Sequence, residues 1–410
     1  MSPRFQAPRG TFDILAQEWG QRARVYAVAA EIFDRAGYGR IETPAFEDTD
    51  LFARGVGQST DIVQKEMFSF EDQGGRNLTL RPEGTAPIVR AYLEHGMQKL
   101  AQPVKLWHWG PYFRHERPQS GRFREFNQIG AEAIGSDSPL VDAELIILLD
   151  ELFRGLALPG IRLRLGSLGS ADSRVAYREE LKAYLRGRQK ELAPSVRERI
   201  DLNPMRAFDS DDPGTRQVME EAPTMLERLG EDDAGHFNAV RAVLDRAGIA
   251  YQLDPTLVRG LDYYTRTVFE FESDRLGAQA ALGGGGRYDG LVERLGGRAT
   301  PACGWAAGIE RIVLALDEEE GGNAIDVFVA ASPDRRERAF ALVRELRRAG
   351  LRAELDLADR SLKGQMKQAD RLGARAAIVL EEERPAQLRD MASGEQRELD
   401  LARAVEELGA

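Results

Sequence analysis

The sequence predicts two domains of different fold class: an α+β domain built on an antiparallel sheet and carrying a helical insertion, followed by a small α/β domain. Two aromatic-rich strand patterns joined by an arginine-rich loop at 111–135 indicate an antiparallel hairpin in the first domain. Strand and helix patterns alternate regularly after residue 325, which is typical of a largely parallel sheet. A chain of 410 residues also exceeds what one hydrophobic core usually supports. We therefore predict domains at 1–322, with the insertion at about 170–248, and at 323–410.

Hydrophobic periodicity predicts the elements of the first domain. Val25, Val28 and Ile32 recur at helical spacing, whereas apolar and polar residues alternate in the predicted strands. Between about 170 and 248 the pattern becomes helical and highly charged, which predicts the insertion. The expected elements are, in chain order, a helix at 21–38, a strand at 39–47, a helix at 84–96, strands at 105–116 and 123–135, a helix at 139–154, a strand after residue 262, and a strand running into a helix at 302–316.

The second domain follows the acidic, glycine-containing stretch DEEEGGNA at 317–324, which is the best linker in the chain. Its apolar runs are short and separated by amphipathic segments, as in alternating strands and helices. The expected elements are strands at 325–331, 351–357 and 376–382 and helices at 333–350, 361–373 and near 401–408.

The composition restricts the class of protein. The chain contains no long uncharged apolar run, and its N-terminus lacks the apolar centre of a signal peptide, so we expect a cytoplasmic protein with no membrane contact. Cys303 is the only cysteine, which excludes an internal disulfide and a multi-cysteine zinc site. The four histidines show no metal-binding spacing, so we predict no transition-metal centre built by the protein.

The charge distribution bears on nucleic-acid binding. A net charge of -11 argues against nonspecific association with a polyanion, and we expect no DNA partner. Residues 335–375 nevertheless carry twelve Arg and Lys against six Asp and Glu. This basic stripe is either a set of solvated helix faces or a local nucleic-acid contact.

The glycine run LGGGGRYDG at 282–290 is not a nucleotide loop of a known kind. A Gly-Lys-Ser/Thr sequence does not follow it, and the GxGxxG spacing that starts at Gly283 fails at Tyr288. Because glycine has no Cβ, such a backbone can approach a ligand closely. A glycine-rich turn or bulge explains the run equally well.

The predicted hairpin concentrates arginines at its loop. Arg114, Arg117, Arg122 and Arg124 lie on or beside this loop, with Phe126 on the following strand. Surface arginines on a hairpin are normally solvated. An arginine beside an aromatic ring could instead bind phosphate through its planar fork while the ring stacks on a base.

Three further segments place polar residues where a binding site or an ordinary structural role could explain them. In TLRPEGTAP (79–87), Glu83 and Thr85 either cap a helix or bind a ligand, and the two roles are compatible. Arg311 begins an otherwise apolar helix and must point to water or meet an anion. Arg259 precedes two tyrosines at the start of a strand, which on its own is consistent with an amphipathic hairpin.

Taken together and in this order, the motifs resemble those of class II aminoacyl-tRNA synthetases, and specifically of histidyl-tRNA synthetases. The resemblance covers essentially the whole chain. GYGRIETPAFE resembles class II motif 1, FRHERPQSGRFREF motif 2, and GWAAGIERIVLAL motif 3. LVRGLDYYTRTVFE and LGGGGRYDGL resemble two peptides typical of the histidine enzymes. The resemblance implies a class II catalytic domain followed by an anticodon-binding α/β domain.

It also implies an activity: L-histidine reacts with ATP to give histidyl-adenylate and pyrophosphate, and histidine is then transferred to the 3′ end of tRNA(His). A carboxylate must attack the α-phosphorus of ATP, so fixed positive charge from arginines and Mg2+ has to offset the repulsion between two anions. Neutral imidazole offers one hydrogen-bond donor and one acceptor. A carboxylate and a hydroxyl therefore complement it, and the resemblance assigns these roles to Glu132 and Tyr264.

The resemblance implies further roles residue by residue. Arg259 and Arg114 are the catalytic residues that act on the α-phosphate. The implied ATP contacts are Arg114, Glu116, Phe126 and Arg311. The implied histidine contacts are Glu83, Thr85, Gln128, Glu132, Arg259, Tyr263, Tyr264 and Tyr288, with Gly304 in the floor of the pocket. The implied contacts to the acceptor end of tRNA are Gln119 and Arg124.

Motif 1 also implies a homodimer, because in this class it builds the subunit interface; alternatively, Pro44 only bends an edge strand. Two other functions are compatible with parts of the pattern. One is a non-catalytic paralogue that serves as a histidine-sensing regulatory subunit of ATP phosphoribosyltransferase. The other is a class II synthetase for proline or threonine. The anticodon module and the intact histidine peptides favour the histidine enzyme over both.

Overall fold

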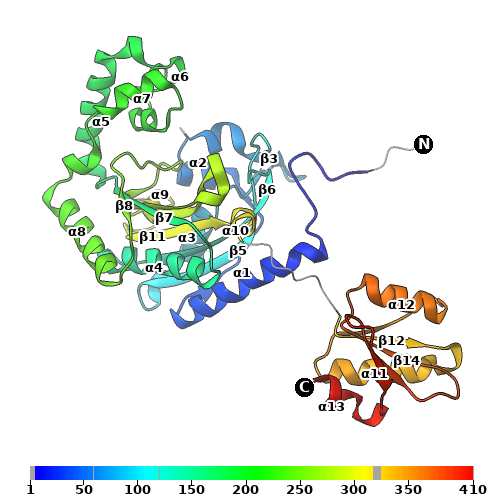
Figure 1. The fold of residues 1–410 in the computed structure, drawn as a ribbon. Helices are drawn as coiled ribbons and strands as arrows, with labels where there is room; N and C mark the ends of the chain where they lie inside the picture. Colours follow the sequence, from blue (N-terminus) through cyan, green and yellow to red (C-terminus); the bar gives the residue numbers. More distant parts are fainter. Residues whose placement is uncertain (1–4, 59, 120, 317–324, 410) are drawn as a thin grey trace. The chain divides into compact units, whose positions relative to one another are not determined.

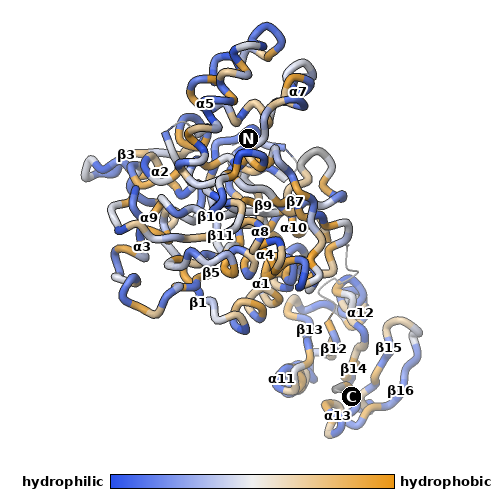
Figure 2. Tube along the Cα trace, turned by 90° about the vertical axis from the view of Figure 1, so that its left-hand side faces the viewer, coloured by the Kyte–Doolittle hydropathy of each residue, from blue (hydrophilic) through white to orange (hydrophobic). Residues whose placement is uncertain are grey.

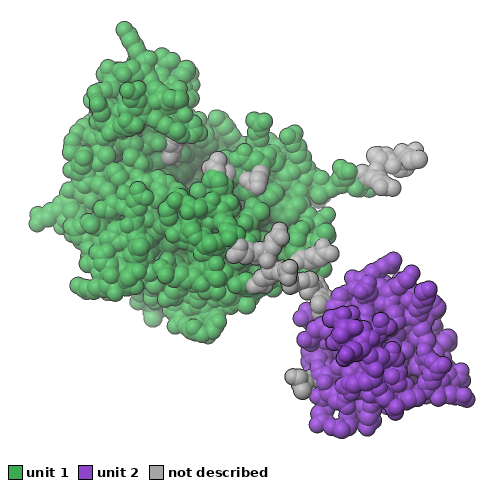
Figure 3. Space-filling view, in the orientation of Figure 1, with its two compact units in different colours: residues 1–317 green, residues 318–410 purple. Residues whose placement is uncertain are grey.

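The computed structural model describes residues 5–409 apart from 59, 120 and 317–324. The chain divides into two compact units, residues 1–317 and 318–410 (Figure 3). The linker expected at 317–324, and with it the predicted boundary between 322 and 323, lies outside the described residues.

The first unit is organised around an eight-stranded sheet (Figure 1). Its six central strands pair antiparallel, and each edge strand pairs parallel with its neighbour. In spatial order the strands are β1 (Gly39–Arg40), β5 (Val104–Phe113), β6 (Glu125–Ile134), β11 (Ala302–Gly308), β10 (Ala281–Arg287), β9 (Thr265–Ser273), β7 (Ile161–Ser167) and β8 (Gln252–Leu253). The antiparallel sheet predicted from the arginine-rich hairpin is confirmed, and that hairpin is β5–β6.

Among the described residues, this unit also contains a second, three-stranded antiparallel sheet and ten α-helices. The small sheet has the order β2 (Phe46–Asp48), β4 (Asn77–Leu80), β3 (Phe68–Glu71). The α-helices are α1 (Ala16–Arg35), α2 (Thr49–Val56), α3 (Thr85–Glu94), α4 (Pro139–Gly155), α5 (Ala171–Gly187), α6 (Pro194–Arg197), α7 (Pro213–Glu220), α8 (Glu231–Arg246), α9 (Leu291–Arg294) and α10 (Ile309–Ala315).

Helices α1, α4, α8 and α10 contribute to the largest hydrophobic cluster, which also contains Trp107, Phe269 and Trp305 of the large sheet. In Figure 2, hydrophobic residues are frequent where α4 and α8 lie over the sheet. Because α8 packs into this cluster, the last helix of the region predicted as an insertion (170–248) belongs to the main core. The helices that project from the body in Figure 1 are α5, α6 and α7.

The strand predicted at 39–47 forms as two short strands, β1 and β2. Pro44 lies between them, and proline has no N–H to donate to a sheet ladder. The buried Arg81 side chain fixes this bend, because its Nη1 donates to the carbonyl oxygens of Thr43 (2.7 Å) and Pro44 (3.5 Å). A single proline thus moves the chain from the large sheet to the small one.

The glycine run forms strand β10, with register shifts after Ala281 and after Gly286. Both shifts match the bulge expected as one of the two alternatives. The absence of Cβ atoms also allows close approach of the neighbouring strands, whereas close approach of this backbone to a ligand stays a prediction. A Cβ on Gly285 would lie 2.0 Å from the carbonyl oxygen of Gly304, and one on Gly284 would lie 2.4 Å from that of Phe269. A side chain at either position is therefore incompatible with this sheet.

The second unit is a five-stranded sheet with helices. The three strands predicted after residue 325 pair parallel, whereas two further strands pair antiparallel at one edge. In spatial order the strands are β13 (Ala353–Leu355), β12 (Val327–Ala331), β14 (Ala376–Leu380), β15 (Gln387–Asp390) and β16 (Gln396–Glu398), and the helices are α11 (Arg336–Arg348), α12 (Leu362–Arg371) and α13 (Ala404–Gly409). The predicted α/β class is confirmed, and the hairpin β15–β16 was not predicted.

Candidate active site

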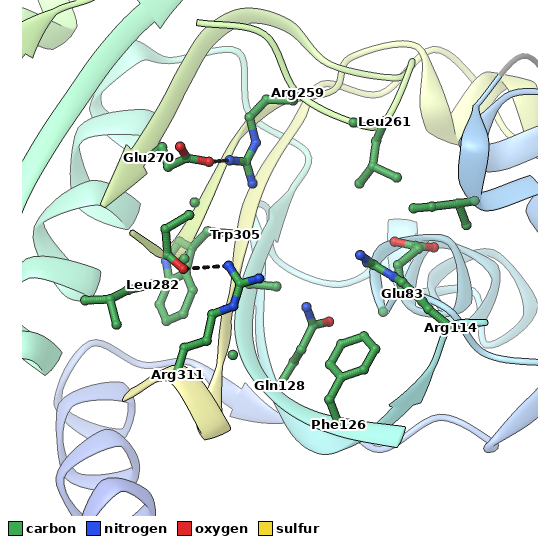
Figure 4. Close-up of a pocket in the computed structure, with 18 of the residues that line it drawn as sticks. Glu83, Arg114, Phe126, Gln128, Arg259, Leu261, Glu270, Leu282, Trp305 and Arg311 are labelled. Atoms are coloured by element: carbon green, nitrogen blue, oxygen red, sulfur yellow. Dashed lines mark hydrogen bonds and ion pairs between the residues drawn. The ribbon is translucent and has the colours of Figure 1, made fainter. Parts of the chain in front are cut away.

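One cavity of about 250 Å³ lies on the large sheet, between strands β6, β9, β10 and β11, the start of α10 and the loop between β5 and β6 (Figure 4). The structure brings together there ten residues that the sequence assigns to ATP or histidine. These are Glu83, Thr85, Arg114, Glu116, Phe126, Gln128, Arg259, Tyr263, Tyr264 and Arg311. They come from positions 228 residues apart in the chain, so the fold alone makes them neighbours.

Arg259 reaches the cavity from the segment that precedes β9, and it forms an ion pair with Glu270 of β9 (Figure 4). Burial acts to lower the pKa of the Arg259 guanidinium, but Glu270 and the neighbouring tyrosines raise it above its usual value. Arg259 is therefore a fixed positive charge at any physiological pH, and Glu270 holds it in place.

Arg114 and Arg311 supply two more cations. The Nε of Arg114 donates to the carbonyl oxygen of Pro82 (2.8 Å), and its guanidinium lies 5.3 Å from the ring centroid of Phe126. Arg311 donates to two backbone carbonyl oxygens, from Nε to Gly121 (3.0 Å) and from Nη1 to Ala281 (2.8 Å). Figure 4 shows Arg259 and Arg311 on one side of the cavity and Arg114 on the other. Positive charge thus flanks the cavity from both sides.

Two buried carboxylates, Glu83 and Glu132, lie at or behind the cavity wall, and Glu83 lies beside Arg114 (Figure 4). Glu83 accepts hydrogen bonds from the backbone N–H groups of Thr85 (2.7 Å) and Ala86 (2.9 Å), so it caps α3 as predicted. Burial raises the pKa of Glu83, and those two N–H groups act in the opposite direction. The phenol of Tyr263 also donates to Glu83, at 3.4 Å.

Glu132 is almost completely buried on β6 and is held by two hydroxyls. Thr85 Oγ1 donates to its Oε1 (2.7 Å), and the phenol of Tyr288 donates to its Oε2 (2.5 Å). Burial raises the pKa of Glu132 to about 8, although both hydrogen bonds lower it. Glu132 and Tyr288, two of the predicted histidine contacts, therefore contact each other, but they lie behind Thr85 and not on the wall of the cavity itself.

Glycine at position 304 makes room for this carboxylate. Gly304 of β11 is the register partner of Glu132, and a Cβ there would lie 1.6 Å from Glu132 Oε2. Any larger residue at position 304 would therefore displace the Glu132 carboxylate, whereas the role of Gly304 in the floor of the pocket stays a prediction, because Gly304 does not itself line the cavity.

The two residues predicted to contact tRNA lie outside the cavity. Gln119 is exposed in the β5–β6 loop, where its backbone pairs with that of Arg122. Arg124 is half-buried and ties the N-terminal segment to this loop, with its backbone N–H donating to the carbonyl oxygen of Gly10 (2.7 Å) and its Nε to that of Glu116 (3.3 Å). Arg124 thus has a structural role in the loop, and its contact with tRNA stays a prediction.

Sequence reasoning missed the acidic residues that position the arginines. Glu270 is one. Glu310 is another: its Oε1 pairs with Arg22 of α1 (2.9 Å), and its Oε2 accepts from the backbone N–H of Asn127 (2.9 Å), which anchors the start of α10 to β6. The IER triplet in which Glu310 stands was the available signal, since a carboxylate in an apolar run needs a partner.

A fully buried ion pair lies behind Tyr288. Arg287 and Asp142 are completely buried and contact each other, and Asp142 also accepts from His236 Nε2 at 2.7 Å. Arg287 additionally donates to the carbonyl oxygens of Ser136 (2.9 Å) and Ser138 (3.1 Å). The end of β10 is thereby fixed to α4 and α8, which constrains the position of Tyr288.

A metal ion at this cavity would need ligands from the substrate as well as from the protein. Among the described residues, no group of three or more His, Cys, Asp or Glu side chains could hold a metal ion. Glu116 and Glu270 both line the cavity. This donor set fits a Mg2+ ion that binds one or two carboxylates and takes its remaining ligands from phosphates and water.

The comparisons with known proteins agree with the fold and the cavity. The family model described as histidyl-tRNA synthetase matches residues 10–312, and the model described as anticodon binding domain matches residues 326–410. The histidine–tRNA ligase of Rubrobacter xylanophilus is 49% identical over 407 residues, covering 96% of each chain. The crystal structure of apo Staphylococcus aureus histidyl-tRNA synthetase superposes with a TM-score of 0.82 at 37% identity, covering 99% of this chain and 100% of that one.

A structure described as an ATP phosphoribosyltransferase regulatory subunit/histidyl-tRNA synthetase from Bacillus halodurans is also similar, with a TM-score of 0.71 at 26% identity over 94% of this chain and 100% of that one. Its lower identity, together with the match to the anticodon-binding model, does not favour the regulatory alternative. The family match likewise disfavours a proline or threonine enzyme.

The antiparallel sheet and the arginine-flanked cavity define a class II aminoacyl-tRNA synthetase. Within that class, the chain belongs to the histidyl-tRNA synthetase family. The predicted enzyme, a histidine–tRNA ligase, is confirmed at this level. In the part of the chain that the structure describes, no helix is both long enough and apolar enough to cross a membrane.

Proposed function

We propose that this chain activates L-histidine with ATP to give histidyl-adenylate and pyrophosphate, and then transfers histidine to the 3′ end of tRNA(His). The observation that carries the proposal is the convergence of Arg114, Arg259 and Arg311 on one cavity that Tyr264 also lines, with Glu132 directly behind Thr85 of the cavity wall. Fixed guanidinium groups stabilise charge that develops on phosphate without reorganising during the reaction. A cytoplasmic location is part of this proposal.

On the ATP side, Arg259 and Arg114 approach the α-phosphate, and Arg311 binds the γ-phosphate. Phe126 stacks on the adenine ring while Glu116 accepts from the adenine amino group. Support for this division comes from the placement of Phe126 and Arg114 on one side of the cavity and Arg311 on the other (Figure 4). When bound, Mg2+ would neutralise phosphate charge, with Glu270, the cavity carboxylate that the adenine does not use, as its available protein ligand.

On the histidine side, Glu132 and Tyr264 bind the two imidazole nitrogens, with Tyr288 holding the Glu132 carboxylate. Glu83, Thr85 and Gln128 bind the α-amino and carboxylate groups, and Tyr263 fixes Glu83 through its 3.4 Å hydrogen bond. Burial raises the pKa of Tyr264 to about 12, so its phenol keeps its proton at neutral pH. The hydroxyl can therefore donate to one nitrogen.

For the second step, the exposed loop between β5 and β6 presents Gln119 and Arg124 to the acceptor end of tRNA. The second unit binds the anticodon, with the basic stripe at 335–375 as its positively charged surface.

Histidine-dependent exchange of labelled pyrophosphate into ATP tests the first step. We expect exchange with histidine and no exchange with proline, threonine or the other amino acids, because a site that hydrogen-bonds imidazole leaves buried polar groups unpaired with other side chains. Exchange with a different amino acid would overturn the specificity. Histidine binding without exchange would favour a regulatory protein.

The proposed assembly is a homodimer built on motif 1 (GYGRIETPAFE, 37–47). Phe46 and Phe70 support it, because both are about half exposed on the small sheet and their ring centroids lie 6.2 Å apart. An exposed aromatic pair of this kind is typical of a protein interface. We expect sedimentation at micromolar concentration to give twice the chain mass of 45.6 kDa. A species with the mass of one chain would contradict the dimer.

A further inference from the structure

A second cavity, of about 320 Å³, lies on the other side of the segment that carries Arg259. It forms where α5 and the 3₁₀ helix at Pro204–Asp209 meet the segment 258–262 and α9. Arg259 and Leu261 line both this cavity and the candidate active site. The two cavities are therefore separated by a short stretch of chain.

The lining of this cavity is strongly cationic. Five arginines contribute to it, from α5, the 3₁₀ helix, the 258–262 segment and α9, together with a single carboxylate, Asp262. Arg259 already pairs with Glu270. The side chains of Arg174, Arg178 and Arg294 form no ion pair with any carboxylate in the part of the chain that the structure describes. Three guanidinium groups consequently share this cavity without an ion pair, although the nearby Asp262 carboxylate acts on Arg174 electrostatically.

Arg174 is the least favourably placed of these three arginines, because its side chain is partly buried. Its Nε is shielded from solvent and has no hydrogen-bond partner among the described residues. Burial, followed by the charges of Arg294 and Arg178, lowers the pKa of Arg174 to about 10. Arg178 is held by a bond from Nη2 to the carbonyl oxygen of Leu202 (2.7 Å). A buried donor without a partner and repelled by its neighbours is stabilised when an anion occupies the cavity.

We infer that Arg174, Arg178 and Arg294 form a second phosphate-binding site beside the active site, an inference that rests on the proposed function. Planar guanidinium groups match the oxygen geometry of phosphate, and several converging arginines are typical of phosphate recognition. The proposed reaction involves two sources of phosphate other than ATP itself and the adenylate. These are the backbone phosphates of the tRNA and the released pyrophosphate. The site takes one of these, and the two sources predict different kinetic changes.

The test uses the full-length enzyme with Arg174→Gln, Arg178→Gln and Arg294→Gln, assayed for pyrophosphate exchange and for aminoacylation of purified tRNA(His). If the site binds a tRNA phosphate, we expect KM for tRNA to rise roughly ten-fold and the salt dependence of tRNA binding to weaken by about one counterion per variant. Exchange should then be unchanged. If it binds pyrophosphate, KM for pyrophosphate in exchange should rise and KM for tRNA should not.

Arg216→Gln is the matched control. It removes one positive charge from the same helical region, but Arg216 is exposed and pairs with Asp211 away from the cavity. Arg294 is itself exposed on α9, so its variant carries little risk of misfolding. The inference is overturned if the Arg294 and Arg174 variants, folded as judged by an unchanged thermal midpoint, match Arg216→Gln in both assays. It is also overturned if all parameters fall together, which would indicate a structural role. Absence of exchange in the unmodified enzyme would instead refute the proposed function.

Discussion

Replacing Arg259 with alanine is expected to lower histidine-dependent pyrophosphate exchange by about 10³-fold, because removing one preorganised group that stabilises transition-state charge costs roughly 10²- to 10³-fold and an arginine on a phosphoryl group costs at least as much. The structure adds a second contribution. Without Arg259, the Glu270 carboxylate remains in the cavity without that partner and repels the incoming triphosphate. The measurement is kcat/KM for exchange, with Arg259→Lys expected to recover only part of the loss because lysine lacks the planar fork.

Arg164→Ala is the control for this experiment. Arg164 also contacts Glu270 (3.5 Å), and it pairs with Glu272 (2.8 Å) and Asp254, but it does not line the cavity. Its removal therefore disturbs the same carboxylate without removing a cation from the active site. Equal losses in the Arg164 and Arg259 variants would mean that Arg259 acts by neutralising Glu270. Near-normal exchange in Arg259→Ala would contradict its assigned role altogether.

The sequence predicts the fold well where periodicity carries the information. The helix at 139–154 and the strands of the β5–β6 hairpin are predicted within a few residues. Strands β15 and β16 are missed for the opposite reason. Their residues 387–390 and 396–398 are mostly polar, and pairing with β14 rather than hydrophobicity makes them strands. Such tertiary control of strand formation leaves little trace in a single sequence.

The candidate site shows a similar division. The motifs identify the residues that line the cavity, since their types and spacing are specific. They do not identify Asp142, which stands 145 positions from its partner Arg287. Only the register of β10 against its neighbours and the packing of α4 bring that pair together. Sequence spacing also cannot show that Arg174 and Arg294 share a cavity with Arg259, because the chain between them forms several separate elements.

The sequence alone also cannot give the pKa of Glu132. The resemblance supplies its role, but the raised pKa results from burial that depends on Thr85, Tyr288 and the glycine at position 304. A carboxylate in so enclosed a position can be destabilising for the empty protein while it is essential for recognition. Replacing Glu132 should therefore weaken histidine binding and, at alkaline pH, stabilise the folded protein.

Glu132→Gln should raise KM for histidine by about 10- to 100-fold, because a hydrogen bond to a charged group is lost, while KM for ATP stays near its normal value. The same variant should be more stable than the unmodified enzyme at alkaline pH. The folded-state pKa of Glu132 is about 8, above the ordinary value of 4.5, so the folded protein binds a proton more tightly than the unfolded chain does. Its stability contribution is present below pH 4.5 and is lost as the pH rises through 8.

Glutamine has no such ionisation, so the difference in thermal midpoint between Glu132→Gln and the unmodified enzyme should grow in favour of the variant from pH 5 to pH 9. Tyr288→Phe is the companion change. It removes the 2.5 Å hydrogen bond from Tyr288 to Oε2. Because that hydrogen bond lowers the pKa of Glu132, its removal raises this pKa further, and the loss of stability with rising pH should become larger and continue to a higher pH than in the unmodified protein. A pH-independent difference in midpoint for Glu132→Gln would show that the carboxyl is ionised throughout this range. In that case the buried carboxylate would have to be stabilised mainly by its two hydroxyl partners, and the histidine pocket would be preorganised as an anion.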